Sequence, residues 1–475
     1  MYSINNINSY NTNPLKSAVT VISGKPPAKT LGVVIPTAKN PISFSAAETA
    51  GIRTEIVNKE EKEKYSAVSN ALPKAERKTL EILLKTGKLL NSNSNDKSTT
   101  LDNLYKIITE PRAQGLDAAV VLKETVNTIA DPFVITQNFG DIPKEYVPKI
   151  LEIGKNNTLP TNLIQRAMNI QNTKDPINEQ TINVEHSGAC VSASIEFNLA
   201  KQMPAEFARF AQSLSSPKLS VEKTIHLDKL ANTPLDAIWL LNAFEVPYEA
   251  NDFKTAKLTL APDKSAITRA QIQNSHKDPL ERSLVDVLMQ STFMNVGSQQ
   301  SYDSLTDVRA GKFNQNDKGL IEFEKTFTES VVEDKNKISV TYQTVDENAK
   351  LTGYETDFAT IKKHILETLN MGENVIIGYT QTDENNVIIN GHEITIIGTK
   401  QGKDGKLIFV CNDTDDNYPK QIEYSEDYLI PKIHHAGLPQ EVAEKDMQFV
   451  DNWKEGLNAY KEMKTQNLGT QIHSA

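Results

Sequence analysis

The sequence predicts an α+β protein in which helices come first and a β-sheet follows. Over residues 59–172, apolar residues recur at the three- and four-residue spacing of amphipathic helices. After about residue 337, apolar residues alternate or form short runs typical of strands, as in residues 375–379 and 407–412. Between these regions, a helix that begins at Cys190 is followed by a helix-rich stretch. Helices followed by a sheet, without a regular alternation of the two, favour the α+β class.

Composition excludes several classes of protein. The 475 residues, enough for about two to four domains, carry 51 Lys and Arg against 61 Asp and Glu, a net charge of −10. An acidic chain is not expected to bind nucleic acid, because contact with phosphates requires a basic surface. The only two cysteines, Cys190 and Cys411, exclude a disulfide scaffold and a cysteine-ligated zinc site.

Neither a membrane span nor an ordinary signal peptide is expected. No apolar run approaches the roughly 18 residues that a spanning helix requires. The first 25 residues lack an apolar segment beside a basic one. We therefore expect a cytoplasmic protein or one exported without an ordinary signal peptide. The oligomeric state is not predicted.

The N-terminal part divides into a tail and a helical region. Residues 1–55 are rich in Asn, Ser and Pro, a composition typical of a disordered tail. Residues 56–172 are expected to form an all-α bundle, with one helix beginning after Pro73 and a polar linker at residues 91–99. This region carries no chemical motif; it could be a removable pro-segment or a partner-binding domain.

The second domain is expected to span residues 173–440. Its helix-rich middle, about residues 205–335, is interpreted as a helical insertion between the Cys190 helix and the sheet. An amphipathic helix at 358–371 ends at a glycine and leads into the first of three consecutive strands. A further helix and tail are expected over residues 441–475.

Cys190 is the first candidate for catalysis. It follows Ser187, Gly188 and Ala189, where a glycine-containing loop turns into a helix. A helix N-terminus carries partial positive charge and unpaired N–H groups, which favour the nucleophilic thiolate. The same N–H groups can stabilise an oxyanion formed by attack on a carbonyl group. The alternative is that Cys190 is a small, buried, unreactive side chain.

His392 is the second candidate, at the start of a strand that forms a hairpin with the next one. If the turn occupies residues 399–405, His392 pairs with Asn412, and directly opposed residues share a face of the sheet. A shift of the register by one residue would substitute Asp413 or Cys411 for Asn412. A histidine oriented by an amide or carboxylate, and within reach of a cysteine, is the arrangement that thiol catalysis requires.

The order of these residues resembles the papain-like cysteine peptidase superfamily. The resemblance covers about residues 180–415 and rests on the Cys190 helix, the His392 strand and Asn412 at the end of the next strand. It implies a helix packed on an antiparallel sheet, with Cys190 as nucleophile, His392 as base and acid, and Asn412 as the residue that orients the imidazole. The family's oxyanion glutamine is missing six residues before the cysteine; Gln180 is the nearest candidate.

The resemblance implies hydrolysis of peptide or isopeptide bonds through a thioester, with a protein or peptide as substrate. A transglutaminase or acyltransferase with the same triad, and an inactive binding protein on the same fold, remain alternatives. We expect no cofactor and no metal ion. His434 and His435 are adjacent in the sequence, but no carboxylate or third histidine stands at ligand spacing nearby, so packing or surface roles are expected for them.

Overall fold

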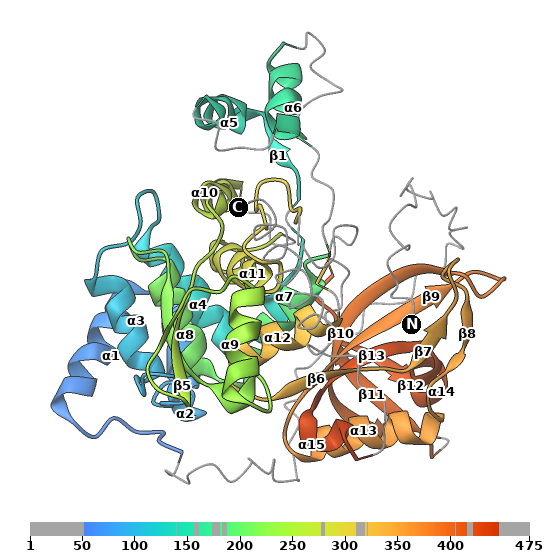
Figure 1. Ribbon diagram of the computed structural model, residues 1–475. Helices are drawn as coiled ribbons and strands as arrows, with labels where there is room; N and C mark the ends of the chain where they lie inside the picture. Colours follow the sequence, from blue (N-terminus) through green and yellow to red (C-terminus); the bar gives the residue numbers. More distant parts are fainter. Residues whose placement is uncertain are drawn as a thin grey trace, which may run out of the picture.

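The computed structural model describes part of the chain (Figure 1): residues 52–138, 140–155, 161–172, 181–182, 188–276, 281–309, 319–320, 322–403, 405–415 and 421–445. These residues form an α+β structure with antiparallel sheets, as predicted. Nearly all of the predicted disordered tail, and residues 446–475 of the predicted C-terminal helix and tail, lie outside the described residues.

The described helices agree with most of the predicted ones. The α-helices are α1 (Lys59–Ala71), α2 (Lys74–Lys85), α3 (Thr100–Thr109), α4 (Ala118–Ala130), α5 (Val147–Gly154), α6 (Thr161–Asn172), α7 (Cys190–Gln202), α8 (Pro204–Leu214), α9 (Pro234–Ala243), α10 (Ala266–His276), α11 (Leu284–Gly297), α12 (Glu322–Glu333), α13 (Phe358–Asn370), α14 (Glu426–Leu429) and α15 (Gln440–Ala443). Short 3₁₀ helices are η2 (Pro132–Val134), η3 (Lys144–Tyr146), η4 (Leu227–Lys229) and η5 (Ile430–Lys432).

The strands form one large sheet and three small ones. They are β1 (Ile142–Pro143), β2 (Thr181–Ile182), β3 (Val221–His226), β4 (Tyr248–Ala250), β5 (Thr255–Leu260), β6 (Lys337–Thr341), β7 (Gln343–Val345), β8 (Leu351–Tyr354), β9 (Val375–Thr382), β10 (Ile388–Gln401), β11 (Leu407–Asn412), β12 (Gln421–Ser425) and β13 (Ile433–Pro439). The large sheet has the order β12-β11-β10-β9-β13-β6, and every neighbouring pair in it is antiparallel.

Helices cover both faces of the large sheet. On one face, α13 packs against β9 and β13, and its Ile365 shares an apolar core with Ile377 of β9. On the other face, α7 and α12 lie between the sheet and the helices α8 and α11 (Figure 1). Ile376, the neighbour of Ile377, points to this second face and joins the helical core. Side chains of β9 therefore alternate between two separate cores, as strand geometry requires.

The N-terminal helices share their core with helices from the middle of the chain. α3 packs against α8, and α4 packs against α8 and α11. Leu104 of α3 and Phe207 of α8 are fully buried in the same apolar cluster. α3 begins with a capping box: Thr99 accepts from the backbone N–H of Asp102, whose carboxylate accepts from the Thr99 N–H.

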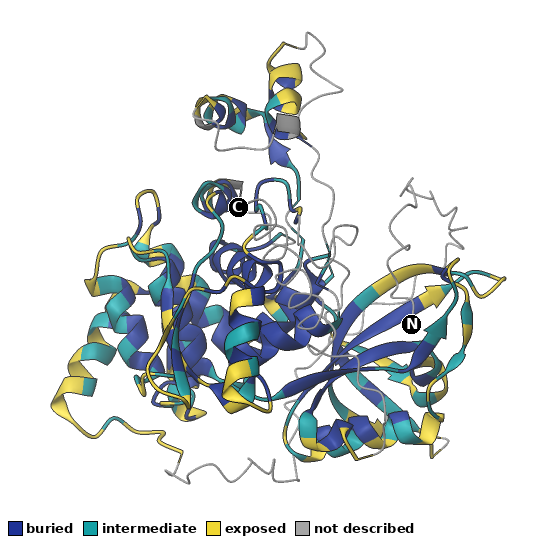
Figure 2. Cartoon of the chain, in the orientation of Figure 1, coloured by how far each residue is buried: buried dark blue, intermediate teal, exposed yellow. Residues whose placement is uncertain are grey.

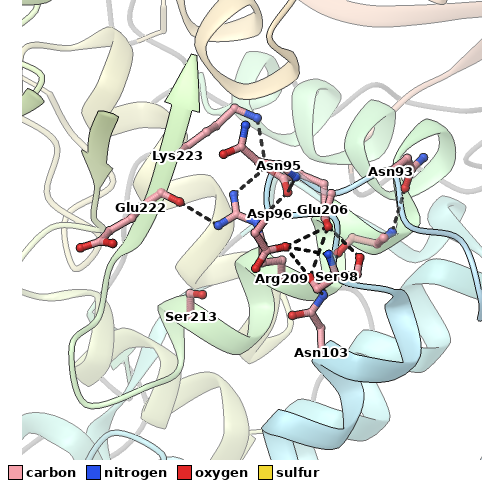
Figure 3. Close-up of polar contacts among 12 residues, drawn as sticks. Asn93, Asn95, Asp96, Ser98, Asn103, Glu206, Arg209, Ser213, Glu222 and Lys223 are labelled. Carbon is pink, nitrogen blue, oxygen red and sulfur yellow. Dashed lines mark hydrogen bonds and ion pairs between the residues drawn. The ribbon is translucent and has the colours of Figure 1, made fainter. Parts of the chain in front are cut away.

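The predicted polar linker at residues 91–99 is fixed to α8 and β3 by a buried ionic network (Figure 3). The carboxylate of Glu206 accepts hydrogen bonds from the Asn95 backbone N–H at 2.9 Å and from Arg209 Nε at 2.7 Å. Lys223 Nζ donates to the same carboxylate at 3.0 Å. Glu206 is completely buried, so the network compensates a charge that would otherwise be very costly.

The predicted helical insertion at residues 205–335 also contains a three-stranded sheet, β3-β5-β4, which the sequence analysis missed. β3 alternates strictly between buried and exposed residues, and β5 nearly does so. This alternation was visible in the sequence, but the strands lie between strongly helical segments. No helix in the described part of the chain has the length and apolarity needed to cross a membrane.

Candidate active site

Cys190 is the first residue of α7, a helix that is buried over most of its length (Figure 2). Every residue from Cys190 to Ala200 is buried, and Cys190 itself is 8% exposed. Gly188 precedes the helix with a φ of 82°, a left-handed conformation that glycine adopts without strain. Ala189 at the N-cap makes no side-chain capping bond, which leaves the first N–H groups of α7 without a side-chain cap among the described residues.

His392 lies in β10, between the carboxylate of Asp413 and the thiol of Cys190. Its Nε2 atom lies 2.8 Å from Oδ1 of Asp413, the residue that follows β11. The Cys190 thiol, which donates to the Gly188 carbonyl at 3.4 Å, is also close enough to the imidazole to raise its pKa. Because Asp413 occupies Nε2, Nδ1 is the ring nitrogen left to face the thiol. The edge of the Tyr379 ring packs against the imidazole, with ring centroids 5.9 Å apart.

The surroundings of His392 favour the charged imidazolium. Burial of the ring lowers its pKa, but the hydrogen bond with Asp413 and the interaction with the Cys190 thiol outweigh burial. The net result is a pKa of His392 held well above its ordinary value. A second hydrogen bond orients Asp413, whose Oδ1 also accepts from the backbone N–H of Asp415 at 3.0 Å.

The predicted pairing of His392 with Asn412 is wrong. Asn412 pairs with Thr395 of β10, and His392 pairs with Tyr379 of β9. β10 extends further than predicted, to Gln401, which pairs with Leu407, and the register shifts at a bulge between Ile396 and Gly398.

In the observed register, Asp413 and not Asn412 lies on the same face of the sheet as His392. Ile396 pairs with Cys411, so by alternation His392 and Asp413 belong to one face and Asn412 to the other. Asn412 is fully buried beside Thr395. Asp413, which a one-residue shift of the predicted register would have selected, is the residue that contacts the imidazole.

Gln180 and Cys411 were the other residues for which the sequence predicted a role near the site. Gln180, the candidate oxyanion donor, lies outside the described residues. Cys411 is fully buried, and burial raises the pKa of its thiol far above the ordinary value, as expected for an unreactive core residue. Gln137, which sequence reasoning missed, lies next to the site: its backbone N–H donates to the Thr414 carbonyl at 2.8 Å.

The arrangement brings a thiol, an imidazole and a carboxylate together at a helix N-terminus. These three groups come from positions 190, 392 and 413, on α7, β10 and the end of β11. A thiol beside an imidazolium can ionise and attack a carbonyl carbon, and uncapped helix N–H groups can bind the resulting oxyanion.

Comparisons of the whole chain with protein-family models, curated proteins and solved structures find no match.

Proposed function

We propose that the protein is a cysteine peptidase that hydrolyses peptide or isopeptide bonds, with a papain-like arrangement of Cys190, His392 and Asp413. The single observation that carries this proposal is the position of the His392 imidazole, which lies 2.8 Å from the Asp413 carboxylate and close enough to the Cys190 thiol for the thiol to raise its pKa. The three groups come from distant parts of the chain, and the side chains of His392 and Asp413 are only 12% and 15% exposed. A general base needs an acceptor that orients its ring and a nucleophile within reach, and His392 has both beside it.

In this mechanism the Cys190 thiolate attacks the carbonyl carbon of the scissile bond. The oxyanion is stabilised by N–H groups at the start of α7. Protonated His392 donates its proton to the leaving amine, which departs as the carbonyl re-forms in a thioester. A water molecule, deprotonated by His392, then attacks the thioester and releases the carboxylate product and the thiolate. Asp413 keeps the ring oriented and stabilises its positive charge.

The proposal assigns to Asp413 the orienting role that the sequence assigned to Asn412. A carboxylate stabilises the imidazolium more strongly than an amide does, because it carries a full negative charge. The thiolate–imidazolium pair should therefore persist to lower pH with Asp413 than with an amide at this position.

A mapped digestion tests the function. Full-length protein is incubated with a mixture of unfolded polypeptides and of lysine-linked isopeptides, and new termini and acyl adducts are identified by mass spectrometry. We expect cleavage and a thioester on Cys190, both abolished in Cys190→Ala and strongly reduced in His392→Ala. The matched control is Cys411→Ala, which removes the other thiol and should retain cleavage.

The outcomes separate the proposed function from its alternatives. Added primary amine that is incorporated into the product, in place of hydrolysis, would identify an acyltransferase with the same triad. Neither cleavage nor an acyl adduct on Cys190 with any substrate would refute the enzymatic function and favour a binding protein.

A further inference from the structure

A second cluster of ionisable side chains lies on the large sheet, apart from the Cys190 site. Glu322, the first residue of α12, meets the consecutive residues His434 and His435 of β13. The two Nδ1 atoms are 2.9 Å apart. Glu322 Oε1 lies 3.3 Å from Nδ1 of His434 and 3.8 Å from Nδ1 of His435. One oxygen and two nitrogen atoms thus converge on one point.

We propose that Glu322, His434 and His435 bind one zinc ion. Zinc binds histidine nitrogen and carboxylate oxygen at about 2.0–2.2 Å, so ligand atoms at tetrahedral angles lie roughly 3.3 Å apart. The three separations scatter around this value, and a single point lies about 2 Å from all three atoms. Imidazole and carboxylate ligands without thiolate suit zinc among the common divalent ions.

The backbone of β13 explains how two neighbouring histidines can face one point. Consecutive residues in a regular strand point to opposite faces of the sheet. In β13 the pairing with β9 shifts register between Ile433 and His435, and such irregularities re-aim side chains next to functional sites. Both rings are consequently buried, with His434 at 3% and His435 at 9% exposure.

Gly378, opposite His435 on β9, makes room for the ring. A Cβ atom at position 378 would approach Cε1 of His435 to 2.2 Å, a distance that real contacts essentially never show. A residue with any side chain at this position would displace the imidazole from its place beside Glu322. The site therefore depends on a glycine as well as on its three ligand residues.

Outer hydrogen bonds fix the ligand atoms in the orientation that a metal ion requires. His435 Nε2 lies 2.7 Å from Oε1 of Glu393, and donation of its proton to this carboxylate leaves the Nδ1 lone pair facing Glu322. Thr341 Oγ1 donates to Oε2 of Glu322 at 2.9 Å, which leaves Oε1 facing the histidines. A carboxylate behind a ligating histidine and a donor behind a ligating carboxylate are usual partners around bound metal ions.

A bound ion would connect α12 to β13, and a fourth, small ligand such as water would complete its coordination. The connection is independent of the proposed peptidase activity. Lys325, one turn after Glu322, already pairs with Glu393 at 3.3 Å on the same face. The ion would therefore extend a set of polar contacts that fixes this helix on the sheet.

Metal titration of the Cys190→Ser protein tests the proposal. This background lacks the nucleophile, so it excludes thiolate ligation at the Cys190 site and makes the result independent of peptidase activity. Full-length protein freed of metal by a chelator is titrated with Zn²⁺ in competition with a chromophoric chelator, and with Co²⁺ by visible absorption. We expect one equivalent of Zn²⁺ and a Co²⁺ spectrum typical of four-coordinate ligation.

Three variants test whether the metal ion is bound by Glu322, His434 and His435. Glu322→Gln should weaken binding by more than about 100-fold, and Thr341→Val, which retains the ligands, by about 10-fold. His226→Ala is the matched control, because His226 pairs with Asp334 at 2.9 Å on the surface and should not affect affinity. Zn²⁺ should raise the Tm of the background protein but not that of Glu322→Gln.

Absence of stoichiometric binding would overturn the proposal, as would binding that Glu322→Gln and Thr341→Val leave unchanged. The two histidines would then be a hydrogen-bonded part of the core. If the wild-type chain binds Zn²⁺ but Cys190→Ser does not, the ion belongs to the Cys190 site and this proposal is also overturned.

Discussion

Replacement of Asp413 by asparagine should slow alkylation of Cys190 at pH 6 by roughly 10- to 100-fold. The substitution retains the size of the side chain and an oxygen near His392 Nε2, but it removes the negative charge. Asp413 Oδ1 and His392 Nε2 are 2.8 Å apart, and the two side chains are 15% and 12% exposed. The charge therefore acts on the imidazolium with little screening by water.

The magnitude follows from two limits. Two unit charges about 4 Å apart attract by about 4 kcal/mol at an effective dielectric constant of about 20, which is close to a factor of 1,000 in an equilibrium. An ordinary thiol is only about 0.3% ionised at pH 6, so loss of a thiolate–imidazolium pair lowers the ionised fraction by about 300-fold at most. The greater intrinsic nucleophilicity of an ordinary thiolate offsets roughly 10-fold of this loss.

The assay is a time course of iodoacetamide labelling between pH 4 and pH 9, with the labelled peptide identified by mass spectrometry. Asp415→Asn is the matched control, because it changes a neighbouring acid but keeps the backbone N–H that bonds Asp413. Asn412→Ser should leave the pH dependence unchanged, since Asn412 pairs with Thr395. Cys411 is fully buried and should stay unlabelled in the folded protein.

Two results would refute the reasoning. If Asp413→Asn labels Cys190 at pH 6 as fast as the wild-type protein, the carboxylate does not support an ion pair. If the wild-type protein itself labels like an ordinary thiol with a pKa near 8.5, no pair exists to be supported.

Three further substitutions test buried groups that hold the fold together. Glu206→Gln should cost about 3–5 kcal/mol in the free energy of unfolding at pH 7, because it leaves Lys223 buried without its full partner. Burial raises the pKa of Glu206, but Lys223 and Arg209 lower it to about 2, so the cost should shrink as pH falls from about 4.5 to about 2. Urea titrations across this range measure the cost, and a cost that does not depend on pH would contradict the ion pair. Glu329 is a buried residue of α12, and burial raises its pKa to about 7. Wild-type stability should therefore fall by about 3 kcal/mol between pH 4.5 and pH 7, and Glu329→Gln should abolish this part of the slope. Equal slopes in the two proteins would contradict a raised pKa of Glu329. Ile376→Ala should lower the free energy of unfolding, measured by heat or urea, by about 2–5 kcal/mol, because the fully buried Ile376 side chain joins the sheet to the helical core. A loss below about 1 kcal/mol would show that this side chain does not join the two.

Local patterns predicted the helices and the strands of the hairpin well, because both have short-range causes. α2 begins directly after Pro73, where proline is well tolerated, and α7 begins at Cys190, after the glycine loop. The partner of His392 could not be predicted equally well. A bulge and a longer first strand make Asp413, and not Asn412, the partner of His392. The position of a bulge depends on the packing of the whole sheet, which local patterns do not reveal.

Contacts between residues far apart in the chain also could not be predicted from the sequence. Glu322 is more than 100 positions from His434, so no spacing rule connects them, and the adjacent histidines alone predicted only packing. The small sheet β3-β5-β4 was missed for the opposite reason: its alternation is local, but helical segments on both sides concealed it.

The buried network of Glu206 has a consequence for any processing of this chain by proteolysis. Asn95 and Glu206 stand on opposite sides of residues 173–187, so a nick in that segment would leave two fragments joined by their interior contacts. Separation of the fragments would expose the apolar surfaces of α3 and α8 and bring the charges of Glu206 and Arg209 into water. A nicked protein should therefore migrate as one species in size-exclusion chromatography and as two bands under denaturing conditions. A single cut would not be enough to release the N-terminal helices.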